Sequence, residues 1–305
     1  MFCFKMNFKA IQTFLPDSAL CREYKVKSLR DFLSSSPEKL CTMLQTSYSI
    51  IVQVKKDLLS EHSASPIPGI EEYQNLLERE HHISTGSLKL NELVGGLEGG
   101  QVYEVIGNTG SGKTQLCLTA TAECLLGGGT VVYIDTRGDF SLRRLEQILT
   151  ARGTPPDTLH SHLERVSFSR IATAEELWEA VQVVAEEEEK VKLMVIDNLS
   201  LPLLKLVTED QVQGGMYIGC LVSHLLQRIA HTRTTAVLLV SNIKGGGGGG
   251  GPPNLPALGA VWEVAANVRL LLERVAVETI RASVLRGDLR PEVNFTINER
   301  GVTDC

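Results

Sequence analysis

The sequence predicts an α/β core with a mostly parallel sheet flanked by helices, preceded by a small all-α domain. Two observations predict the core. From residue 83 onward, apolar runs alternate with helical stretches, which is typical of a parallel sheet covered on both faces. Residues 107–114 also match G-x-x-x-x-G-K-[ST], a phosphate-binding loop that joins a strand to a helix. A third observation, helical periodicity in residues 1–60, predicts the small domain.

The small domain is predicted at residues 1–60. Apolar side chains recur there at three- and four-residue spacing over residues 20–44, as on one face of a helix. Ser36 followed by Pro37 is typical of a helix N-terminus, because it supplies a capping hydroxyl and a proline at the first helical position. Residues 49–59 predict another short helix, so we expect a compact helical bundle.

A linker is predicted at residues 61–82, because Pro66 and Pro68 occur there among serines and a glycine. Whether residues 70–80 form a short helix within it stays open. Two interpretations also stay open for residues 1–15, a targeting segment or the first helix of the small domain. The absence of arginine and serine from these fifteen residues favours the helix.

The core is predicted at residues 83–305. Its central strands are expected at residues 102–106, 130–134, 166–168, 193–196 and 236–240. Helices are expected near residues 113–126, 141–151, 174–189 and 216–231. Three further apolar runs follow without helices between them, at residues 268–272, 279–285 and 293–297. These runs predict an antiparallel edge of the same sheet.

Bulk composition narrows the classes of function. The formal net charge is −6, whereas a protein that binds nucleic acid mainly through bulk charge is usually basic, so any DNA contact must be local or shared with partners. The seven cysteines are scattered and never spaced as C-x-x-C, which argues against a zinc site and a disulfide framework. No apolar run approaches the ~20 residues of a membrane-spanning helix, so no membrane association is expected.

The phosphate-binding loop predicts a nucleotide site. Its residues are Gly107, Asn108, Thr109, Gly110, Ser111, Gly112, Lys113 and Thr114. An apolar strand precedes the loop and a helical run follows it, which is the context that the motif requires. Loop N–H groups would surround the β-phosphate, Lys113 would reach the β- and γ-phosphates, and the Thr114 hydroxyl would join a Mg²⁺ shell. ATP and Mg²⁺ are therefore the expected cofactors.

The second half of this site is predicted at Asp197. The apolar run 193–196 is followed directly by Asp197. A carboxylate at the end of this strand would hold a Mg²⁺-bound water. Apolar runs that end in Asp are common, so the prediction depends on the pairing of Asp197 with the phosphate-binding loop. Thr114 and Asp197 together are the expected Mg²⁺-binding residues, acting through the nucleotide and water.

Several segments outside the loop resemble the RecA-like DNA strand-exchange recombinases. They occur in the order of that family at residues 83–100, 133–136, 194–198, 240–242 and 295–304. The resemblance implies a RecA-like P-loop ATPase core from residue 83 to the end. The short helical N-terminal domain and the Pro-x-Leu-Gly-x-x-Trp stretch at residues 256–262 are similar to the D-type paralogues of the eukaryotic recombinase. That type is a subunit of a heteromeric paralogue complex that supports homologous recombination.

Two positions depart from the pattern of active recombinases. The resemblance places a water-orienting glutamate directly after Tyr-Ile-Asp-Thr, and Arg137 stands there. A guanidinium stays protonated, so it cannot accept a proton from water. Asp139 would substitute only if its loop bends, and Ile243 stands where a sensor Gln or His is expected. No catalytic residue is therefore assigned, and we expect nucleotide binding with weak or absent hydrolysis.

The two DNA-binding loops that the resemblance implies are poor in cations. The first, at residues 203–216, holds Lys205 with two acids, and the second, at residues 244–256, holds Lys244 alone. Since each neutralised phosphate needs a cation, DNA binding is predicted to be weak and shared with partners. For the glycine run 245–251, a spacer and a DNA-facing loop are equal alternatives.

The predicted function is an ATP-binding subunit of a hetero-oligomer of recombinase paralogues, supporting DNA repair by homologous recombination in the nucleus. The identity of the partners and the preferred DNA structure stay open. The alternative is an active DNA-dependent ATPase or strand-exchange recombinase. Arg137 and Ile243 favour the first reading.

Overall fold

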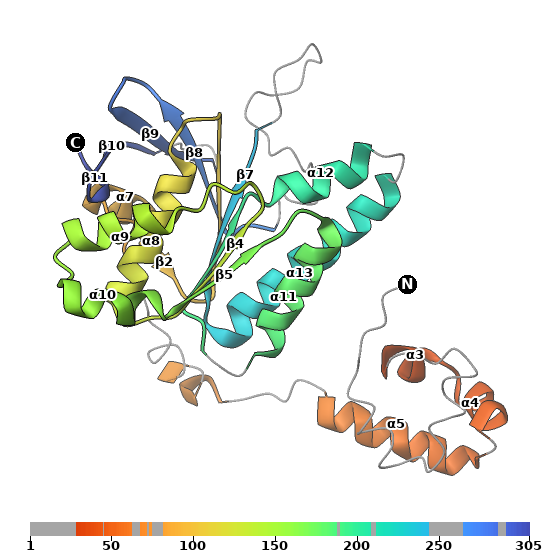
Figure 1. Cartoon of the computed structure of the whole chain (residues 1–305). Helices are drawn as coiled ribbons and strands as arrows, with labels where there is room; N and C mark the ends of the chain where they lie inside the picture. Colours follow the sequence, from red (N-terminus) through yellow and green to blue (C-terminus); the bar gives the residue numbers. More distant parts are fainter. Residues whose placement is uncertain are drawn as a thin grey trace. The chain divides into compact units, whose positions relative to one another are not determined.

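The computed structural model describes residues 29–44, 46–62, 68–71, 73–74, 82–187, 190–208, 212–243, 265–285 and 291–305. The chain divides into two compact units, Met1–Tyr73 and Gln74–Cys305 (Figure 1). The division predicted above, into 1–60, 61–82 and 83–305, stays a prediction. Three segments discussed above lie outside the described residues, namely 1–15, 245–251 and 256–262. In the described part of the chain, no helix is both long and apolar enough to cross a membrane.

The first unit contains short helices. They are α3 (Leu29–Ser34), α4 (Pro37–Leu44) and α5 (Tyr48–His62). Ser36 Oγ accepts a hydrogen bond from the backbone N–H of Lys39 at 3.3 Å, so the predicted N-terminus at Ser36 and Pro37 is confirmed. The three helices pack together around a small apolar core, in which Phe32, Leu40 and Ile51 are fully buried.

The second unit is built on one large sheet. Within the described residues, nine strands have the order β11-β10-β9-β8-β3-β7-β6-β4-β5. The strands are β3 (Val102–Gly107), β4 (Val131–Asp135), β5 (Val166–Arg170), β6 (Leu193–Asp197), β7 (Ala236–Ser241), β8 (Val268–Arg274), β9 (Thr279–Val284), β10 (Glu292–Asn298) and β11 (Gly301–Asp304). A separate antiparallel pair joins β1 (His82–Ile83) to β2 (Leu97–Glu98). The five central strands predicted from the sequence are all present and pair in parallel.

The predicted antiparallel edge at residues 268–297 is confirmed by the pairs β8–β9 and β9–β10, but the prediction did not include a parallel pairing of its first strand with β3. Strand β8 pairs in parallel with β3 on one side, with Leu272 opposite Gly107, and antiparallel with β9 on the other. Strand β10 pairs antiparallel with both β9 and β11. A parallel partner requires a crossover connection of about a dozen residues or more. The segment 242–267 is long enough for that crossover, so the lack of a helical pattern in it was a poor guide to strand direction.

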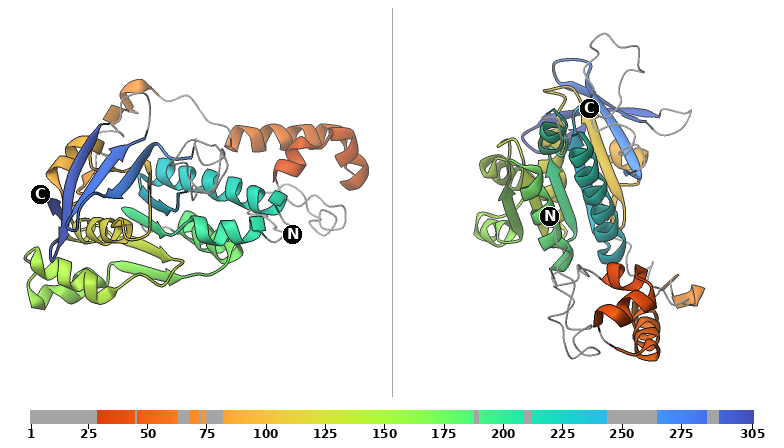
Figure 2. Two further views of the ribbon diagram at one scale, coloured as in Figure 1. Left: turned by 90° about the horizontal axis from the view of Figure 1, so that it is seen from above. Right: turned by 90° about the vertical axis from the view of Figure 1, so that its right-hand side faces the viewer.

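Helices cover both faces of the sheet (Figure 1 and Figure 2). One face carries α8 (Lys113–Leu126), α9 (Leu142–Ala151) and α10 (Pro156–Leu163), and the other carries α11 (Ala174–Glu186), α12 (Ser200–Thr208) and α13 (Val212–Arg233). A short helix, α7 (Leu88–Val94), precedes β3. Side chains alternate along the strands, so Tyr133 packs in the first apolar core and Ile134 in the second.

The carboxyl ends of the parallel strands meet at one edge of this sheet. Gly107 ends β3, Asp135 ends β4, Asp197 ends β6 and Ser241 ends β7. Open α/β sheets bind ligands outside this edge. The fold therefore brings the phosphate-binding loop and Asp197, which are far apart in sequence, to the same place.

Candidate functional site

The phosphate-binding loop runs from the end of β3 to the start of α8, and two of its glycines are required by close contacts. A Cβ atom on Gly107 would lie 2.4 Å from the carbonyl oxygen of Leu272 on β8. Gly112 caps α8 with a φ of 93°, and a Cβ there would lie 2.7 Å from Ile297 and 2.8 Å from Ile280. Any other residue would push the loop away from its neighbours.

Lys113 lies at the start of α8 and is almost fully buried. Its Nζ donates hydrogen bonds to the carbonyl oxygens of Gly107 and Asn108, both at 2.8 Å. Burial lowers the pKa of Lys113, and the nearby Asp197 carboxylate opposes this shift. The buried Ser111 hydroxyl has no partner among the described residues. Together with the N-terminus of a fourteen-residue helix, these donors form a surface that attracts anions.

Asp197 faces this loop from the end of β6. The Thr114 hydroxyl donates to Asp197 Oδ2 at 2.6 Å, and the Tyr133 hydroxyl donates to the same oxygen at 3.3 Å. Burial raises the pKa of Asp197, while the bond from Thr114 lowers it. A hydroxyl and a carboxylate are the hard oxygen donors that Mg²⁺ prefers. The residues present therefore fit a nucleotide phosphate with its Mg²⁺.

Polar side chains connect the strand ends on either side of Asp197. Thr136 Oγ1 donates to the carbonyl oxygen of Asn198 at 2.7 Å, and Asn198 Nδ2 donates to Asn242 Oδ1 at 3.0 Å. These bonds tie the ends of β4, β6 and β7 together. Ile243 follows Asn242, and it is not among the described residues that line the pocket.

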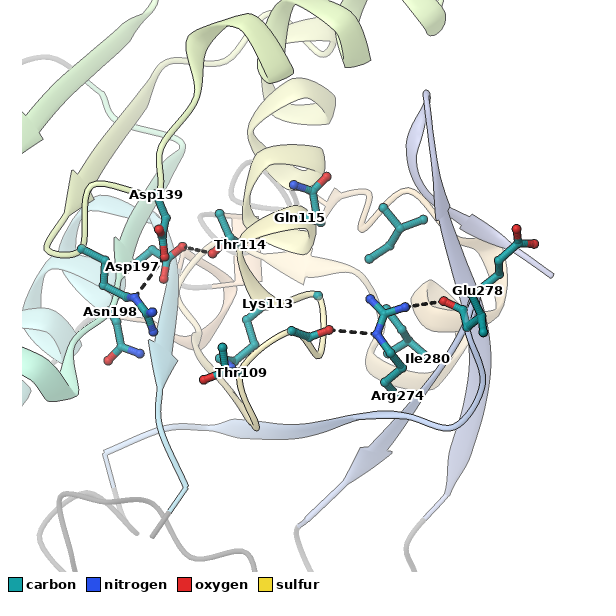
Figure 3. Close-up of a pocket in the computed structure, with 15 residues that line it drawn as sticks. Thr109, Lys113, Thr114, Gln115, Asp139, Asp197, Asn198, Arg274, Glu278 and Ile280 are labelled. Atoms are coloured by element: carbon teal, nitrogen blue, oxygen red, sulfur yellow. Dashed lines mark hydrogen bonds and ion pairs between the residues drawn. The ribbon is translucent and has the colours of Figure 1, made fainter. Parts of the chain in front are cut away.

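The pocket at this edge has a volume of about 370 Å³. Of the residues predicted for the site, those that line it are Thr109, Gly110, Gly112, Lys113, Thr114 and Asp197. Gly107, Asn108 and Ser111 complete the loop behind them. Figure 3 shows Thr114 beside Asp197, with Asp139 next to Asp197. The bend that Asp139 would need to reach the site is present, since Asp139 and Arg137 both line the pocket.

The far wall of the pocket was missed in the sequence. It is formed by the hairpin between β8 and β9, where Arg274, Val277 and Glu278 line the pocket. Arg274 Nε donates to the carbonyl oxygen of Gly110 at 3.0 Å, so this arginine holds the tip of the phosphate-binding loop (Figure 3). A prediction that β8 runs parallel to β3 would have identified Arg274, because both strands would then end at the ligand-binding edge of the sheet.

The segment predicted as the first DNA loop is largely helical where it is described. Helix α12 continues to Thr208 and α13 begins at Val212, and the Lys205 ammonium donates to the carbonyl oxygen of Ala172 at 3.3 Å. The second predicted DNA loop, residues 244–256, lies outside the described residues. Weak DNA contact by these segments stays a prediction.

The mostly parallel sheet, with a phosphate-binding loop between β3 and α8 and an acid at the end of β6, defines a P-loop core of the RecA type. The family model described as Rad51 matches residues 78–305, which is more than half of the chain. The chain therefore belongs to the Rad51 family. This confirms both the predicted fold and the predicted resemblance to the RecA-like recombinases.

Individual relatives agree with this assignment. "DNA repair protein RAD51 homolog 4" of Mus musculus is 28% identical over 264 residues, covering 83% of this chain and 79% of the mouse protein. The Bos taurus protein of the same name is 29% identical over 258 residues, covering 81% and 78%. "DNA repair protein RAD51 homolog 1" of Arabidopsis thaliana is 28% identical over 316 residues, covering 92% and 88%. The first two support the predicted likeness to the D-type paralogues.

Proposed function

We propose that this chain is an ATP-binding subunit of a heteromeric complex of recombinase paralogues, which supports DNA repair by homologous recombination in the nucleus. The observation that carries the proposal is the convergence of Lys113, Thr114 and Asp197 on one pocket, with Thr114 Oγ1 2.6 Å from Asp197 Oδ2. The role in repair rests on family membership and on the names of the relatives.

The residues of the pocket have separate roles in this proposal. The loop N–H groups and the N-terminus of α8 hold the β-phosphate. Lys113, which donates to two loop carbonyls at 2.8 Å, turns to the β- and γ-phosphates. Thr114 and Asp197 would hold Mg²⁺ through the nucleotide and water, and the ion would supply positive charge that offsets the charge of the phosphates. Arg274 keeps the loop in place through its bond to Gly110.

Thermal stability tests the nucleotide site. ATP with Mg²⁺ at a hundredfold excess over its Kd is expected to stabilise the native state by about 2.7 kcal/mol. Lys113→Ala is expected to remove most of this effect, because it deletes the one loop side chain that reaches two phosphates. Lys190→Ala, at an exposed position, is the matched control and should keep the full effect. A wild-type melting temperature that does not change with ATP would contradict the proposal.

Slow hydrolysis is part of the proposal. Arg137 Nε lies 3.0 Å from Asp139 Oδ2, so the carboxylate that would orient water is engaged by a guanidinium. The alternative, an active DNA-dependent ATPase, is favoured by one observation, which is that Asp139 lines the pocket. Phosphate release separates the two. Turnover at the rate of an active recombinase, lost in both Lys113→Ala and Asp139→Asn, would establish the alternative.

Assembly and DNA binding are tested on the full chain. Other recombinase paralogues should co-purify with it, more strongly with ATP than without, and light scattering with ATP should detect no long homopolymer. The net charge of −6 implies that DNA binding by the chain alone is weak. Its salt dependence should be shallow, since the slope is about −0.9 per phosphate neutralised on duplex DNA. A slope equivalent to about five contacts, or long homopolymers, would contradict the proposal.

A further inference from the structure

The turn after β4 is wound around one buried carboxylate. Asp135 is fully buried, and its Oδ1 accepts hydrogen bonds from the backbone N–H groups of Arg137 at 3.0 Å, Gly138 at 2.8 Å and Asp139 at 3.3 Å. Its Oδ2 accepts a fourth bond, from the N–H of Phe140 at 3.2 Å. These bonds fix the path of the backbone, so the side chains of Arg137 and Asp139 start from defined positions.

Both charged side chains of this turn line the nucleotide pocket. Arg137 Nε pairs with Asp139 Oδ2 at 3.0 Å, and the Arg137 side chain remains 33% exposed. The Lys113 side chain lines the same pocket as Arg137. Two cations that face one pocket repel each other unless an anion lies between them.

The order of the strands indicates which part of a nucleotide Arg137 would meet. The phosphate-binding loop follows β3, and the order β3-β7-β6-β4 places the end of β4 beyond Asp197 on β6. The loop amides lie at the near side of the pocket, and Arg137 lies across Asp197 from them. If the first phosphates of a nucleotide bind in the loop, its terminal phosphate is the group nearest to Arg137.

We propose that Arg137 binds the terminal phosphate of a nucleoside triphosphate in the same chain, through the guanidinium Nη groups, while Asp139 positions it through Nε. This proposal rests on the proposed nucleotide site and deepens it. Among the described residues, Arg137 Nε pairs with the side chain of Asp139. A fork-shaped guanidinium can bind a carboxylate and a phosphate at once. The residue in place of a water-orienting glutamate thus distinguishes a triphosphate from a diphosphate.

Nucleotide affinities of the full-length protein test the proposal. Kd values are measured by calorimetry for ADP and for a non-hydrolysable ATP analogue with Mg²⁺, so that hydrolysis has no influence. Arg137→Gln is expected to raise the Kd of the ATP analogue by about tenfold to a hundredfold, which corresponds to the loss of a hydrogen bond to a charged group. Its ADP affinity should change by less than about twofold, because the terminal phosphate is absent. Arg143→Gln, an exposed arginine on α9, is the control and should change neither.

The outcomes separate this proposal from the one on which it rests. If the wild-type chain binds neither nucleotide, the proposed nucleotide site itself fails. If the wild-type chain binds both, but Arg137→Gln weakens both equally or neither, the role of Arg137 is refuted. The melting temperature without nucleotide shows whether Arg137→Gln is folded. If Arg137→Gln does not fold, the Kd values of the wild-type chain are compared instead. Binding of the triphosphate at least about tenfold tighter than ADP supports the proposal, and equal affinities overturn it.

Discussion

Removing one oxygen from the Asp135 carboxylate tests whether this side chain organises the turn that carries Arg137. In Asp135→Asn the amide oxygen can replace Oδ1, which accepts three backbone N–H groups. The amide nitrogen would then face the N–H of Phe140, now 3.2 Å from Oδ2, so one hydrogen bond becomes a contact between two donors. The charge that Arg170 Nη2 approaches at 3.8 Å is lost as well.

The magnitude follows from these contacts. One hydrogen bond to a charged acceptor contributes about 1.5–3 kcal/mol, so Asp135→Asn is expected to lower the free energy of unfolding by about 2 kcal/mol. Asp135→Ala leaves four N–H groups without their acceptor and should cost about 4 kcal/mol, the range of large single-residue effects. Because the Asp135 carboxylate is fully buried, water cannot replace the lost acceptor without opening the turn.

Urea unfolding followed by tryptophan fluorescence measures this loss. Trp178 is buried on α11, and both tryptophans, Trp178 and Trp262, belong to the second unit, so the signal reports that unit. Glu179→Gln, at an exposed position of the same helix, is the control and should stay within about 0.5 kcal/mol of the wild type. If both Asp135 variants also stay within that limit, the carboxylate does not organise the turn, and the fixed position of Arg137 loses its basis.

Three other variants test contacts elsewhere in the second unit. Arg269→Met should lower the free energy of unfolding by about 3–5 kcal/mol, because Glu104 is fully buried and pairs with Arg269 at 2.6 Å. The double variant with Glu104→Leu should recover most of this loss. Equal urea midpoints for Arg269→Met and the wild type would contradict the prediction. Bonds from Ser87 and two backbone N–H groups hold the pKa of Asp304 below its usual range. Its stabilisation is therefore present above the unfolded pKa of about 3.9 and is lost as pH falls through the lower folded value. Asp304→Asn should lower the melting temperature at pH 7 and flatten the acid-side decline; unchanged profiles would refute this. Gly112→Ala should abolish stabilisation by ATP, since its φ is 93° and its Cβ would meet Ile280; a full ATP effect in that variant would show that the loop tolerates the strain.

The parallel part of the sheet and one wall of the pocket could be predicted from the sequence. Buried strands such as β6 (Leu193–Asp197) are continuous apolar runs, and a run of that kind is visible without any partner. The phosphate-binding loop is visible because its glycines are needed for local reasons, such as the approach of Leu272 to Gly107.

The other wall could not be predicted, because it depends on contacts between distant residues. The hydrogen bond from Arg274 to Gly110 follows from the pairing of β8 with β3, and no local pattern records that pairing. Helix α10 (Pro156–Leu163) was also missed. Its apolar side chains are only Leu159 and Leu163, which pack partly buried against the core, and one pair at four-residue spacing is too short a pattern to predict a helix. The turn around Asp135 was partly visible: Asp139 was expected to reach the site only if the turn bends, but the buried acceptor that bends it is recognisable only in three dimensions.

The position of Arg274 in the chain has a consequence for how the protein is made. The phosphate-binding loop and its far wall are separated by roughly 160 residues, so at about 5–20 residues per second the ribosome synthesises the loop about 8–30 s before Arg274. Throughout that interval β3 lacks β8 as its neighbour, and Gly110 lacks the arginine that holds its carbonyl. A nascent or prematurely terminated chain can therefore carry the whole phosphate-binding motif without a finished nucleotide pocket. The stabilisation by ATP that is proposed above is therefore expected only for molecules whose translation has passed the β8–β9 hairpin.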